Sequence, residues 1–328
     1  MKDILNKLFS KTVLTRQEAK HTLTEIASGV HNDSLVASFL TVYMMRDLQA
    51  QELAGFRDAM LDLCLSVDLS HYDAMDICGT GGDGKDTFNI STTTSFVLAG
   101  AGQNVVKHGN SAVSSKCGSS DLLLHLGYKF SNDPEKLKSD LDKAGICYLH
   151  APLFHPAMKN VAHIRKDLGL KTFFNLLGPL LNPSKPSKQL VGVYKPEIID
   201  LYQNVLKTEG IDFGIVHSFD GYDEISLTGP FKLATKDKVR TITPEEIGLK
   251  TYKPEDLSGG NSLKESAEIF MSVLENNSTE AQRDVVIANA GISLYIAGKS
   301  PDIKECIDIA RESLVSGKAL ASFKKLID

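Results

Sequence analysis

The sequence predicts an α/β protein with a separate all-α domain: a small helical domain and a larger α/β domain with a mostly parallel central sheet. Two patterns predict this fold class. Before residue 70, apolar residues recur at helical spacing and no strand-like alternation appears, whereas beyond it short apolar runs alternate with helical periodicity. The length of 328 residues is enough for about two domains, and the 42% of hydrophobic residues exclude a disordered or fibrous chain.

The first seventy residues are expected to form at least three helices. The run from Thr15 to Glu18 has the capping-box pattern, and apolar residues follow it at helical spacing. Asp33 or Ser34 is expected to cap the next helix. A third helix is expected over 51–65, where apolar residues again share one face.

Candidate strands of the larger domain are five short apolar runs at 74–78, 104–106, 145–149, 189–193 and 212–217. Helical segments at 122–126 and 198–208 lie between them and are followed by glycine. This alternation is typical of parallel βαβ units. A further helix is expected at 158–168, and an apolar, proline-containing stretch follows at 173–183; periodicity leaves open which domain they join.

Charge and cysteine usage indicate the class and compartment. The 36 Lys and Arg against 41 Asp and Glu give a net charge of −5, which argues against a nucleic-acid binder with its basic surplus. The start of the chain has no signal-peptide stretch, and the apolar run 285–298 is shorter than a spanning helix needs, so we expect a buried helix there. Five widely spaced cysteines without CxxC or zinc spacing favour reduced thiols in a cytoplasmic protein; a nucleophilic cysteine is the alternative.

A glycine-rich loop follows the strand expected at 74–78. Its Gly79-x-Gly81-x-x-Gly84 pattern matches the dinucleotide-binding fingerprint literally, but that site also needs an acidic residue about 20 positions further on. No Asp or Glu occurs from Thr87 to Ser120, and the loop lacks the Gly-Lys-Ser/Thr ending of a Walker motif. The sequence therefore argues against both nucleotide-binding motifs.

The acid-free stretch favours phosphate binding instead. It holds two hydroxyl-rich runs, 89–95 and 111–120, and Lys107, which follows directly after the strand expected at 104–106. Glycine N–H groups, hydroxyls and helix N-termini together form anion sites, although helix caps and turns account for some of the serines. We expect Lys107 to face a phosphate rather than solvent, whereas His108 is open to a structural or a catalytic role.

An acidic loop follows the strand expected at 212–217. It contains Asp220, Asp223 and Glu224. Carboxylates near a phosphate site are the hard oxygen ligands that suit Mg²⁺, and an acidic surface turn is the alternative. The phosphate loops favour the metal role for Asp223 and Glu224 and leave Asp220 open. Together the loops fit transfer of a group activated by a diphosphate leaving group.

Further motifs accompany these loops along nearly the whole chain. In chain order, the motifs are Gly79-Thr80-Gly81-Gly82-Asp83, Asn89-Ile90-Ser91-Thr92, Lys107-His108-Gly109-Asn110, His155-Pro156-Ala157-Met158-Lys159, Arg165, 174–183 and Asp223-Glu224. They resemble the anthranilate phosphoribosyltransferase family, of the nucleoside phosphorylase/phosphoribosyltransferase class with a GTGGD loop. The related pyrimidine nucleoside phosphorylases share the fold and the glycine loop but lack the Lys-His-Gly-Asn segment.

The resemblance implies a domain organisation and a set of partners. Residues 1–68 plus about 157–182 would form the helical domain, responsible for dimerisation and part of the anthranilate site. Residues 69–156 plus 183–328 would form the α/β domain that binds phosphoribosyl diphosphate. The implied partners are these two small-molecule substrates, the cofactor Mg²⁺ and a second copy in a homodimer; neither nucleic acid nor a membrane is expected.

The resemblance also implies roles for individual residues. Those expected around phosphoribosyl diphosphate are Gly79, Gly82, Asp83, Thr87, Asn89, Ile90, Ser91, Thr92, Lys107, His108, Gly109, Asn110, Ser111, Ala112, Val113, Ser114, Ser115 and Ser119. Those expected around anthranilate are Gly79, Asn110, His155 and Arg165. Ser91, Asp223 and Glu224 would hold the metal.

The implied reaction moves the 5-phosphoribosyl group from its diphosphate to the amine of anthranilate, in tryptophan biosynthesis. No residue is assigned as acid or base, because the anilinium formed on attack loses its proton readily; positional and electrostatic catalysis is expected. Ser111, Lys166 and Lys171 stand where the family usually has Arg, and each exchange removes a bidentate donor. The rival functions are a nucleoside phosphorylase, the nucleic-acid-binding branch of this fold and a plain scaffold.

Overall fold

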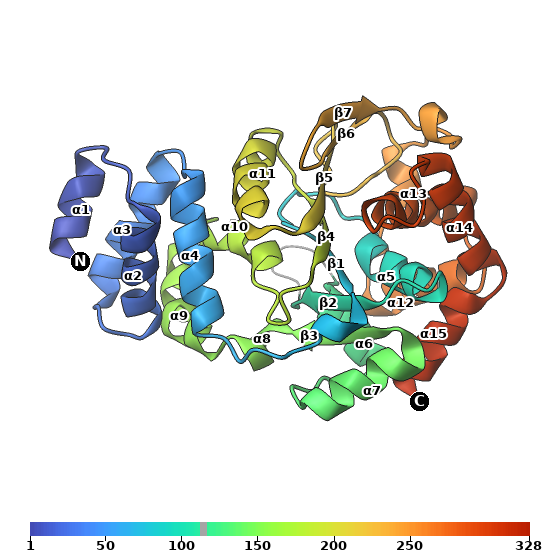
Figure 1. Ribbon diagram of the computed structural model, residues 1–328, viewed down its shortest axis with the longest axis horizontal. Coiled ribbons are helices and arrows are strands. Elements are labelled where there is room, and N and C mark those ends of the chain that lie inside the picture. The colour runs from blue at the N-terminus through green and yellow to red at the C-terminus, as the bar shows by residue number, and fades with distance from the viewer. Residues whose placement is uncertain (112–116) are drawn as a thin grey trace. The chain divides into compact units, whose positions relative to one another are not determined.

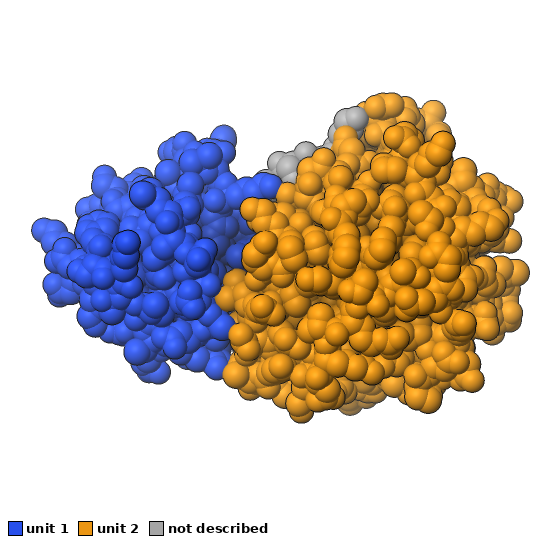
Figure 2. Space-filling view, turned by 90° about the horizontal axis from the view of Figure 1, so that it is seen from above, with its two compact units in different colours: residues 1–67, 151–183 blue, residues 68–150, 184–328 orange. Residues whose placement is uncertain are grey.

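The computed structural model describes residues 1–111 and 117–328, which form two compact units (Figure 2). Unit 1 comprises Met1–Val67 and Ala151–Pro183, and unit 2 comprises Asp68–His150 and Ser184–Asp328. The returning segment of unit 1 is longer than the expected 157–182. It begins at Ala151 because the Leu65 N–H donates to the Phe154 carbonyl (2.8 Å), which ties this stretch to the first segment of the unit.

Unit 1 is all-helical. Its helices are α1 (Lys2–Phe9), α2 (Arg16–Ala27), α3 (Asp33–Met45), α4 (Ala50–Asp62), α8 (Ala151–Phe154), α9 (Lys159–Leu168) and α10 (Phe174–Leu177), with 3-10 turns η2 (Pro156–Met158) and η3 (Gly178–Leu180). The capping box predicted at Thr15 is confirmed. The predicted cap of α3 is wrong by one residue, because the Asn32 side chain accepts the Leu35 N–H (3.1 Å) and Asp33 is already helical.

Aromatic side chains hold the two segments of unit 1 together. Phe39 and Tyr43 of α3 and Phe56 of α4 surround Phe173, which stacks on Phe56 with ring centroids 4.4 Å apart. Asn160 of α9 donates to the carbonyl of Ala27 (2.7 Å). These contacts place the segment around 173 with the helices, a choice that periodicity left open.

Unit 2 contains a seven-stranded sheet in the order β3-β2-β1-β4-β5-β6-β7. The strands are β1 (Met75–Gly79), β2 (Val105–Gly109), β3 (Ile146–His150), β4 (Lys188–Gly192), β5 (Asp212–Ser218), β6 (Phe231–Ala234) and β7 (Val239–Ile242). The first five pair in parallel, and the last two join antiparallel. The five predicted strands and the fold class are confirmed; β6 and β7 were not predicted, because they are four residues long and β7 is mostly exposed.

Helices cover both faces of this sheet: α5 and α13 lie on one face and α11 on the other (Figure 1). The helices of unit 2 are α5 (Ile90–Gly100), α6 (Ser119–His125), α7 (Pro134–Ala144), α11 (Glu197–Glu209), α12 (Leu263–Leu274), α13 (Glu280–Ile296), α14 (Ile303–Val315) and α15 (Lys318–Ile327), with turns η1 (Ser70–Tyr72), η4 (Glu245–Ile247) and η5 (Pro254–Leu257). The strand order reverses direction between β1 and β4. In an open α/β sheet, ligands bind at the carboxyl ends of the strands at such a switch point.

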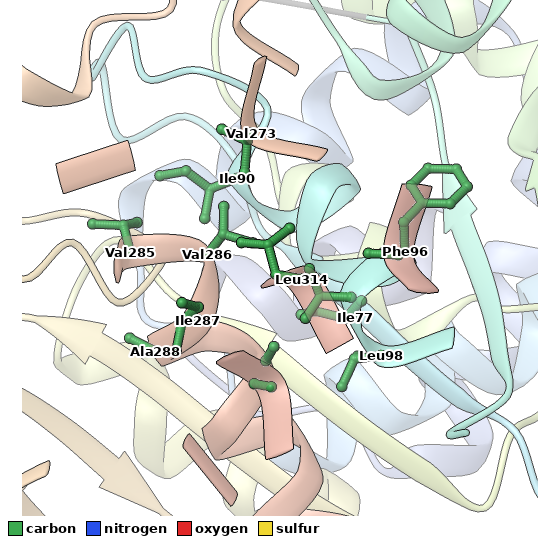
Figure 3. Close-up of a cluster of buried hydrophobic side chains, with 14 of the residues drawn as sticks. Ile77, Ile90, Phe96, Leu98, Val273, Val285, Val286, Ile287, Ala288 and Leu314 are labelled. Carbon is green, nitrogen blue, oxygen red and sulfur yellow. The ribbon is translucent and has the colours of Figure 1, made fainter. Parts of the chain in front are cut away.

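The core of unit 2 lies between the sheet and helices α5, α13 and α14. Figure 3 shows Ile77 of β1 near Leu98 of α5, Val286 of α13 and Leu314 of α14, all of them buried. Most of α13 is buried, as predicted for the apolar run at 285–298. Among the described residues, no helix has both the length and the apolar character to cross a membrane.

Candidate active site

The acidic loop after β5 passes directly over the ends of β1 and β4. Gly79 and Gly192 pair with each other in the parallel ladder. A Cβ atom at Gly79 would lie 2.2 Å from Asp223 Oδ2, and one at Gly192 would lie 1.5 Å from the Asp223 carbonyl oxygen. Only glycine permits so close an approach, so these two positions bring Asp223 to the switch point.

The glycine loop binds the same carboxylate. Gly81, Gly82 and Gly84 all have positive φ, a conformation that glycine adopts without strain. This turn points the Gly81 N–H at Asp223 Oδ2, with a donor–acceptor distance of 2.6 Å. Asp83 turns back on its own loop and accepts the Lys85 N–H (3.0 Å).

The predicted metal ligands come together. Ser91 lies in the first turn of α5, where its N–H donates to Glu224 Oε1 (3.1 Å). Ser91, Asp223 and Glu224 all line one cavity of about 10 Å³, which holds a single water-sized group. Asp220 lies apart from them: it is exposed and accepts a hydrogen bond from Thr228, so it is a turn residue.

Burial and mutual repulsion raise the pKa values of both carboxyl groups. The pKa of Asp223 rises to about 7, chiefly through desolvation and then through the charge of Asp83. The pKa of Glu224 is raised well above its usual value by desolvation, Asp223 and Asp83, although the Ser91 N–H and Lys107 oppose the shift. Two buried carboxylates that repel each other favour a cation between them.

The donor set fits Mg²⁺. No group of three His, Cys, Asp or Glu side chains in residues 1–111 and 117–328 is arranged to hold a metal ion. Mg²⁺ does not require one, since it usually binds one or two carboxylates and completes its shell with water and substrate phosphates. Two carboxylates and the Ser91 hydroxyl therefore suffice.

Lys107 is buried in the middle of β2, with 2% of its surface exposed, because the strand extends to Gly109 and does not end at residue 106 as expected. Its Nζ donates to the Ile77 carbonyl (2.7 Å) and to Ser91 Oγ (3.3 Å). Desolvation lowers the pKa of Lys107, while the nearby Asp76 and Glu224 act in the opposite direction. The solvated alternative for this lysine is thus wrong; the ammonium lies beside the predicted metal ligands.

Asp76 is a site residue that the sequence analysis missed. It is fully buried in β1, and its Oδ1 accepts the backbone N–H of His108 (3.1 Å). β1 and β2 share one registered pair, Met75 with Val105, and beyond it Asp76 and Lys107 provide bonds between the strands. The signal was an aspartate inside an otherwise apolar strand, where an ionised group needs a partner.

The hydroxyl-rich runs meet at the start of α5. Thr92 Oγ1 donates to Ser119 Oγ (2.8 Å), and Asn89 Nδ2 donates to the Cys117 carbonyl (3.1 Å). Ile90 is the first residue of α5, and Thr87 forms an isolated bridge with Ser258.

The remaining predicted residues of the loop after β2 are described only in part. Asn110 Oδ1 accepts the Ser111 N–H (2.8 Å) directly after β2, and His108 is buried one residue before Gly109. Ala112, Val113, Ser114 and Ser115 lie outside the described residues.

The expected anthranilate residues belong to both units: Gly79 and Asn110 to unit 2, and His155 and Arg165 to unit 1. His155 is buried, its Nε2 is 2.9 Å from the Leu181 carbonyl oxygen, and desolvation lowers its pKa, so the ring is neutral with its proton on Nε2. The Arg165 guanidinium is half-buried and lies 5.0 Å from the centre of the Phe174 ring.

Arg165 lacks an acidic partner within unit 1. No carboxylate of the described residues forms an ion pair or hydrogen bond with its guanidinium, and burial lowers its pKa. A guanidinium binds carboxylates through two parallel hydrogen bonds. Arg165 is therefore available for an anionic ligand.

Comparison with known proteins agrees with this geometry. Residues 71–320 match the a/b domain of the glycosyl transferase family, and residues 2–64 match its helical bundle domain. The chain is 52% identical over 327 residues to the anthranilate phosphoribosyltransferase of Cytophaga hutchinsonii, covering 100% of each chain. It is 53% identical over 327 residues to that of Flavobacterium johnsoniae, covering 99% of this chain and 98% of the relative.

Solved structures of similar proteins extend the comparison. The anthranilate phosphoribosyltransferase of Thermus thermophilus superposes with a TM-score of 0.93 at 35% identity, over 98% of both chains. The Saccharomyces cerevisiae enzyme in complex with PRPP (phosphoribosyl diphosphate) and Mg superposes with a TM-score of 0.90 at 30% identity, over 99% of this chain and 96% of that one. Fold and site thus define a member of the glycosyl transferase family. Within that family, the chain belongs to the anthranilate phosphoribosyltransferases.

Proposed function

We propose that this protein transfers the 5-phosphoribosyl group of phosphoribosyl diphosphate to the amine of anthranilate. The products are N-(5-phosphoribosyl)anthranilate and diphosphate, and the reaction is a step of tryptophan biosynthesis. The observation that carries the proposal is the convergence of the glycine loop, Lys107 and the Asp223–Glu224 pair at the switch point of the sheet. Relatives about half identical over their full length bear the name of this activity.

Phosphoribosyl diphosphate would bind at the carboxyl ends of β1 and β2. The glycine loop offers backbone N–H groups, the start of α5 offers its N-terminal dipole, and Thr92 and Ser119 offer hydroxyl groups. Ser91, Asp223 and Glu224 would hold Mg²⁺, which when bound supplies positive charge to the leaving diphosphate. A yeast relative has been solved in complex with PRPP and Mg.

Anthranilate would be bound by Arg165, because its carboxylate matches the guanidinium that has no acidic partner in the described residues. The Phe174 ring, 5.0 Å from the Arg165 guanidinium, provides a cation–π contact that helps to hold it. We propose that His155, Gly79 and Asn110 contribute to the same substrate site. A yeast relative has been solved in complex with 4-fluoroanthranilate.

Catalysis would be electrostatic and positional. As diphosphate leaves, C1 of the ribose gains oxocarbenium character, and the buried Lys107 ammonium stabilises the departing negative charge. Arg165 would orient anthranilate so that its amine faces C1, which lowers the entropic part of the barrier. The anilinium product loses its proton without a positioned base.

We further propose a cytoplasmic homodimer. All five cysteines are free thiols, as in a reducing compartment. Unit 1 exposes large apolar side chains at Phe9, Val13, Met44 and Met45, which a second copy would cover. Sedimentation should give about twice the chain mass of 35.7 kDa, and a monomer at micromolar concentration would contradict the dimer.

The test mixes the protein with Mg²⁺, phosphoribosyl diphosphate and anthranilate and follows anthranilate fluorescence. We expect a loss of fluorescence that requires all four components. Consumption of inorganic phosphate with a nucleoside would favour a phosphorylase instead. No loss of fluorescence together with binding to DNA would favour the nucleic-acid-binding branch of the fold.

A further inference from the structure

A buried polar cluster lies beside the Lys107–Asn110 segment, which comprises the last three residues of β2 and the first residue of the loop that follows, and it is made of residues not assigned to substrate or metal. Its centre is Ser120, in the first turn of α6 and 2% exposed. Ser120 Oγ lies 2.9 Å from the Tyr148 hydroxyl and 2.9 Å from Nδ1 of His150, both in β3. The backbone N–H of Ser120 donates to the carbonyl of Asn110 (3.3 Å). One residue thus connects the end of the loop to the neighbouring strand.

Tyr148 contacts the same segment. β2 and β3 pair in register, with Lys107 opposite Tyr148 and Gly109 opposite His150. A Cβ atom at Gly109 would lie 2.3 Å from the Tyr148 hydroxyl oxygen. The phenol therefore lies directly against the backbone at the end of β2, and a shift of either group displaces the other.

The tautomer of His150 sets the direction of the hydrogen bonds in this cluster. Burial lowers the pKa of His150, and its ring stacks on Phe130 with centroids 4.5 Å apart, which favours the neutral imidazole. A proton on Nδ1 makes His150 the donor to Ser120 and Ser120 the donor to Tyr148. A proton on Nε2 reverses both bonds, so that Tyr148 donates to Ser120 and Ser120 to His150. In either case Ser120 connects the two side chains of β3.

We propose that Ser120, Tyr148 and His150 are positioning residues for phosphoribosyl diphosphate. The cluster fixes Asn110 through the Ser120 N–H, and it fixes Ser119, whose hydroxyl accepts from Thr92, because Ser119 precedes Ser120 in the same helical turn. Asn110 and Ser119, both expected above to lie near phosphoribosyl diphosphate, are thereby tied to one cluster. The inference rests on the function proposed above and assigns the three residues no contact with substrate.

The test compares Tyr148→Phe with Tyr128→Phe. Tyr128 is a buried tyrosine of unit 2 whose hydroxyl donates to Asp140 (2.9 Å). Its ring packs on Phe130, which also packs on Tyr148 and His150, so Tyr128→Phe removes a hydroxyl from the same aromatic core and leaves the hydrogen bonds of Ser120 in place. Each variant loses one buried hydroxyl, so we expect similar falls in melting temperature. Tyr148→Phe should also raise the KM for phosphoribosyl diphosphate about tenfold, as one lost buried hydrogen bond does, with kcat and the anthranilate KM within about twofold of the unaltered protein.

Ser120→Ala should raise the same KM, and the double variant Ser120→Ala/Tyr148→Phe should be no worse than the more impaired single variant, because both remove one network. Independent, multiplying effects would overturn the network. A Tyr148→Phe protein that matches Tyr128→Phe in every constant, while the unaltered protein is active, would overturn this inference alone. An unaltered protein that binds no phosphoribosyl diphosphate would overturn the inference and the proposed function together.

Discussion

The protein buries three charged residues wholly or in part: Lys107, Asp76 and Arg165. Burial distinguishes them from the charged residues at the surface. The burial of Lys107 could be predicted from the apolar run directly before it, although the strand proved to extend past Lys107 to Gly109. Asp76 could not, because its partners, the His108 backbone and the Lys107 ammonium, approach it only when β1 and β2 lie side by side. Arg165 was predicted from its place among the family motifs. Only the structure could show that no acidic side chain of the described residues pairs with it.

Arg165 carries a prediction at this scale. Arg165→Ala should raise the anthranilate KM by about 10- to 100-fold, since a hydrogen bond to a charged group contributes about 1.5–3 kcal/mol. The KM for phosphoribosyl diphosphate should change little. Arg165→Lys should fall between, because an ammonium cannot form the bidentate pair. Steady-state kinetics with each substrate varied in turn measures both constants.

The matched control is Arg16→Ala, which removes a half-exposed arginine of unit 1 that is ion-paired with Asp58. It should cost stability and leave both KM values unchanged. Equal increases in the two KM values of Arg165→Ala would refute the assigned role.

The loop after β5 shows what sequence patterns predict about an element and what they do not. The sequence pattern predicted the strand, the carboxylates that follow it and their suitability as metal ligands. The pattern could not show that the loop lies across the ends of β1 and β4. That placement depends on the close approach of Asp223 to Gly79 and Gly192, which are both far from it in the sequence. The antiparallel β6–β7 pair was missed because each strand has only four residues, too few to establish an apolar alternation, and β7 is mostly exposed.

Gly192 tests the close approach. Gly192→Ala introduces a Cβ that would overlap the Asp223 carbonyl, so the loop must move, and the proposed metal ligands Asp223 and Glu224 with it. We expect a lower melting temperature, from an overpacking cost of about 1–3 kcal/mol, and a turnover reduced by about tenfold or more.

Gly229→Ala is the control for this change, because nothing lies within 4 Å of the added Cβ. It should leave stability and turnover within experimental error. A Gly192→Ala protein with normal turnover would show that the loop does not need this contact.

The buried carboxylates of the same loop predict a pH dependence of stability. The pKa of Asp223 is raised to about 7 in the folded protein, above the ordinary aspartate value of 3.8, so the folded state retains a proton that the unfolded state loses. The contribution of Asp223 to the free energy of unfolding of the metal-free protein should therefore be most favourable below about pH 4. It should fall as the pH rises from there towards 7. Each unit of pKa difference corresponds to about 1.4 kcal/mol.

Melting temperatures in EDTA across this pH range measure the effect. Asp223→Asn should flatten the decline, whereas Asp220→Asn, at an exposed acid of the same loop, should leave it in place. Added Mg²⁺ should stabilise the protein more at higher pH, since metal binding competes with the proton. A decline that persists unchanged in Asp223→Asn would contradict the assignment of this proton to Asp223.

At the scale of the whole molecule, the net charge of −5 conceals an uneven distribution. An acid-free stretch supplies the loops proposed to bind the diphosphate, and the loop after β5 brings two carboxylates to them. Composition alone excluded a polyanion binder, but the distribution of charge indicated a small, highly charged substrate. The division into two units was only partly predictable, because the segment around 173 joins unit 1 through tertiary aromatic contacts that periodicity does not encode.

The measurement that tests the function most directly is the amount of diphosphate released per anthranilate consumed, with and without Mg²⁺. We expect a ratio of about one in Mg²⁺, and no turnover in excess EDTA or in the Asp223→Asn/Glu224→Gln protein, since these carboxylates would hold the metal that neutralises the leaving diphosphate. The double variant should still fold, as its melting temperature will show. Undiminished turnover in EDTA or in the folded double variant, or anthranilate consumption without diphosphate, would contradict the proposed reaction.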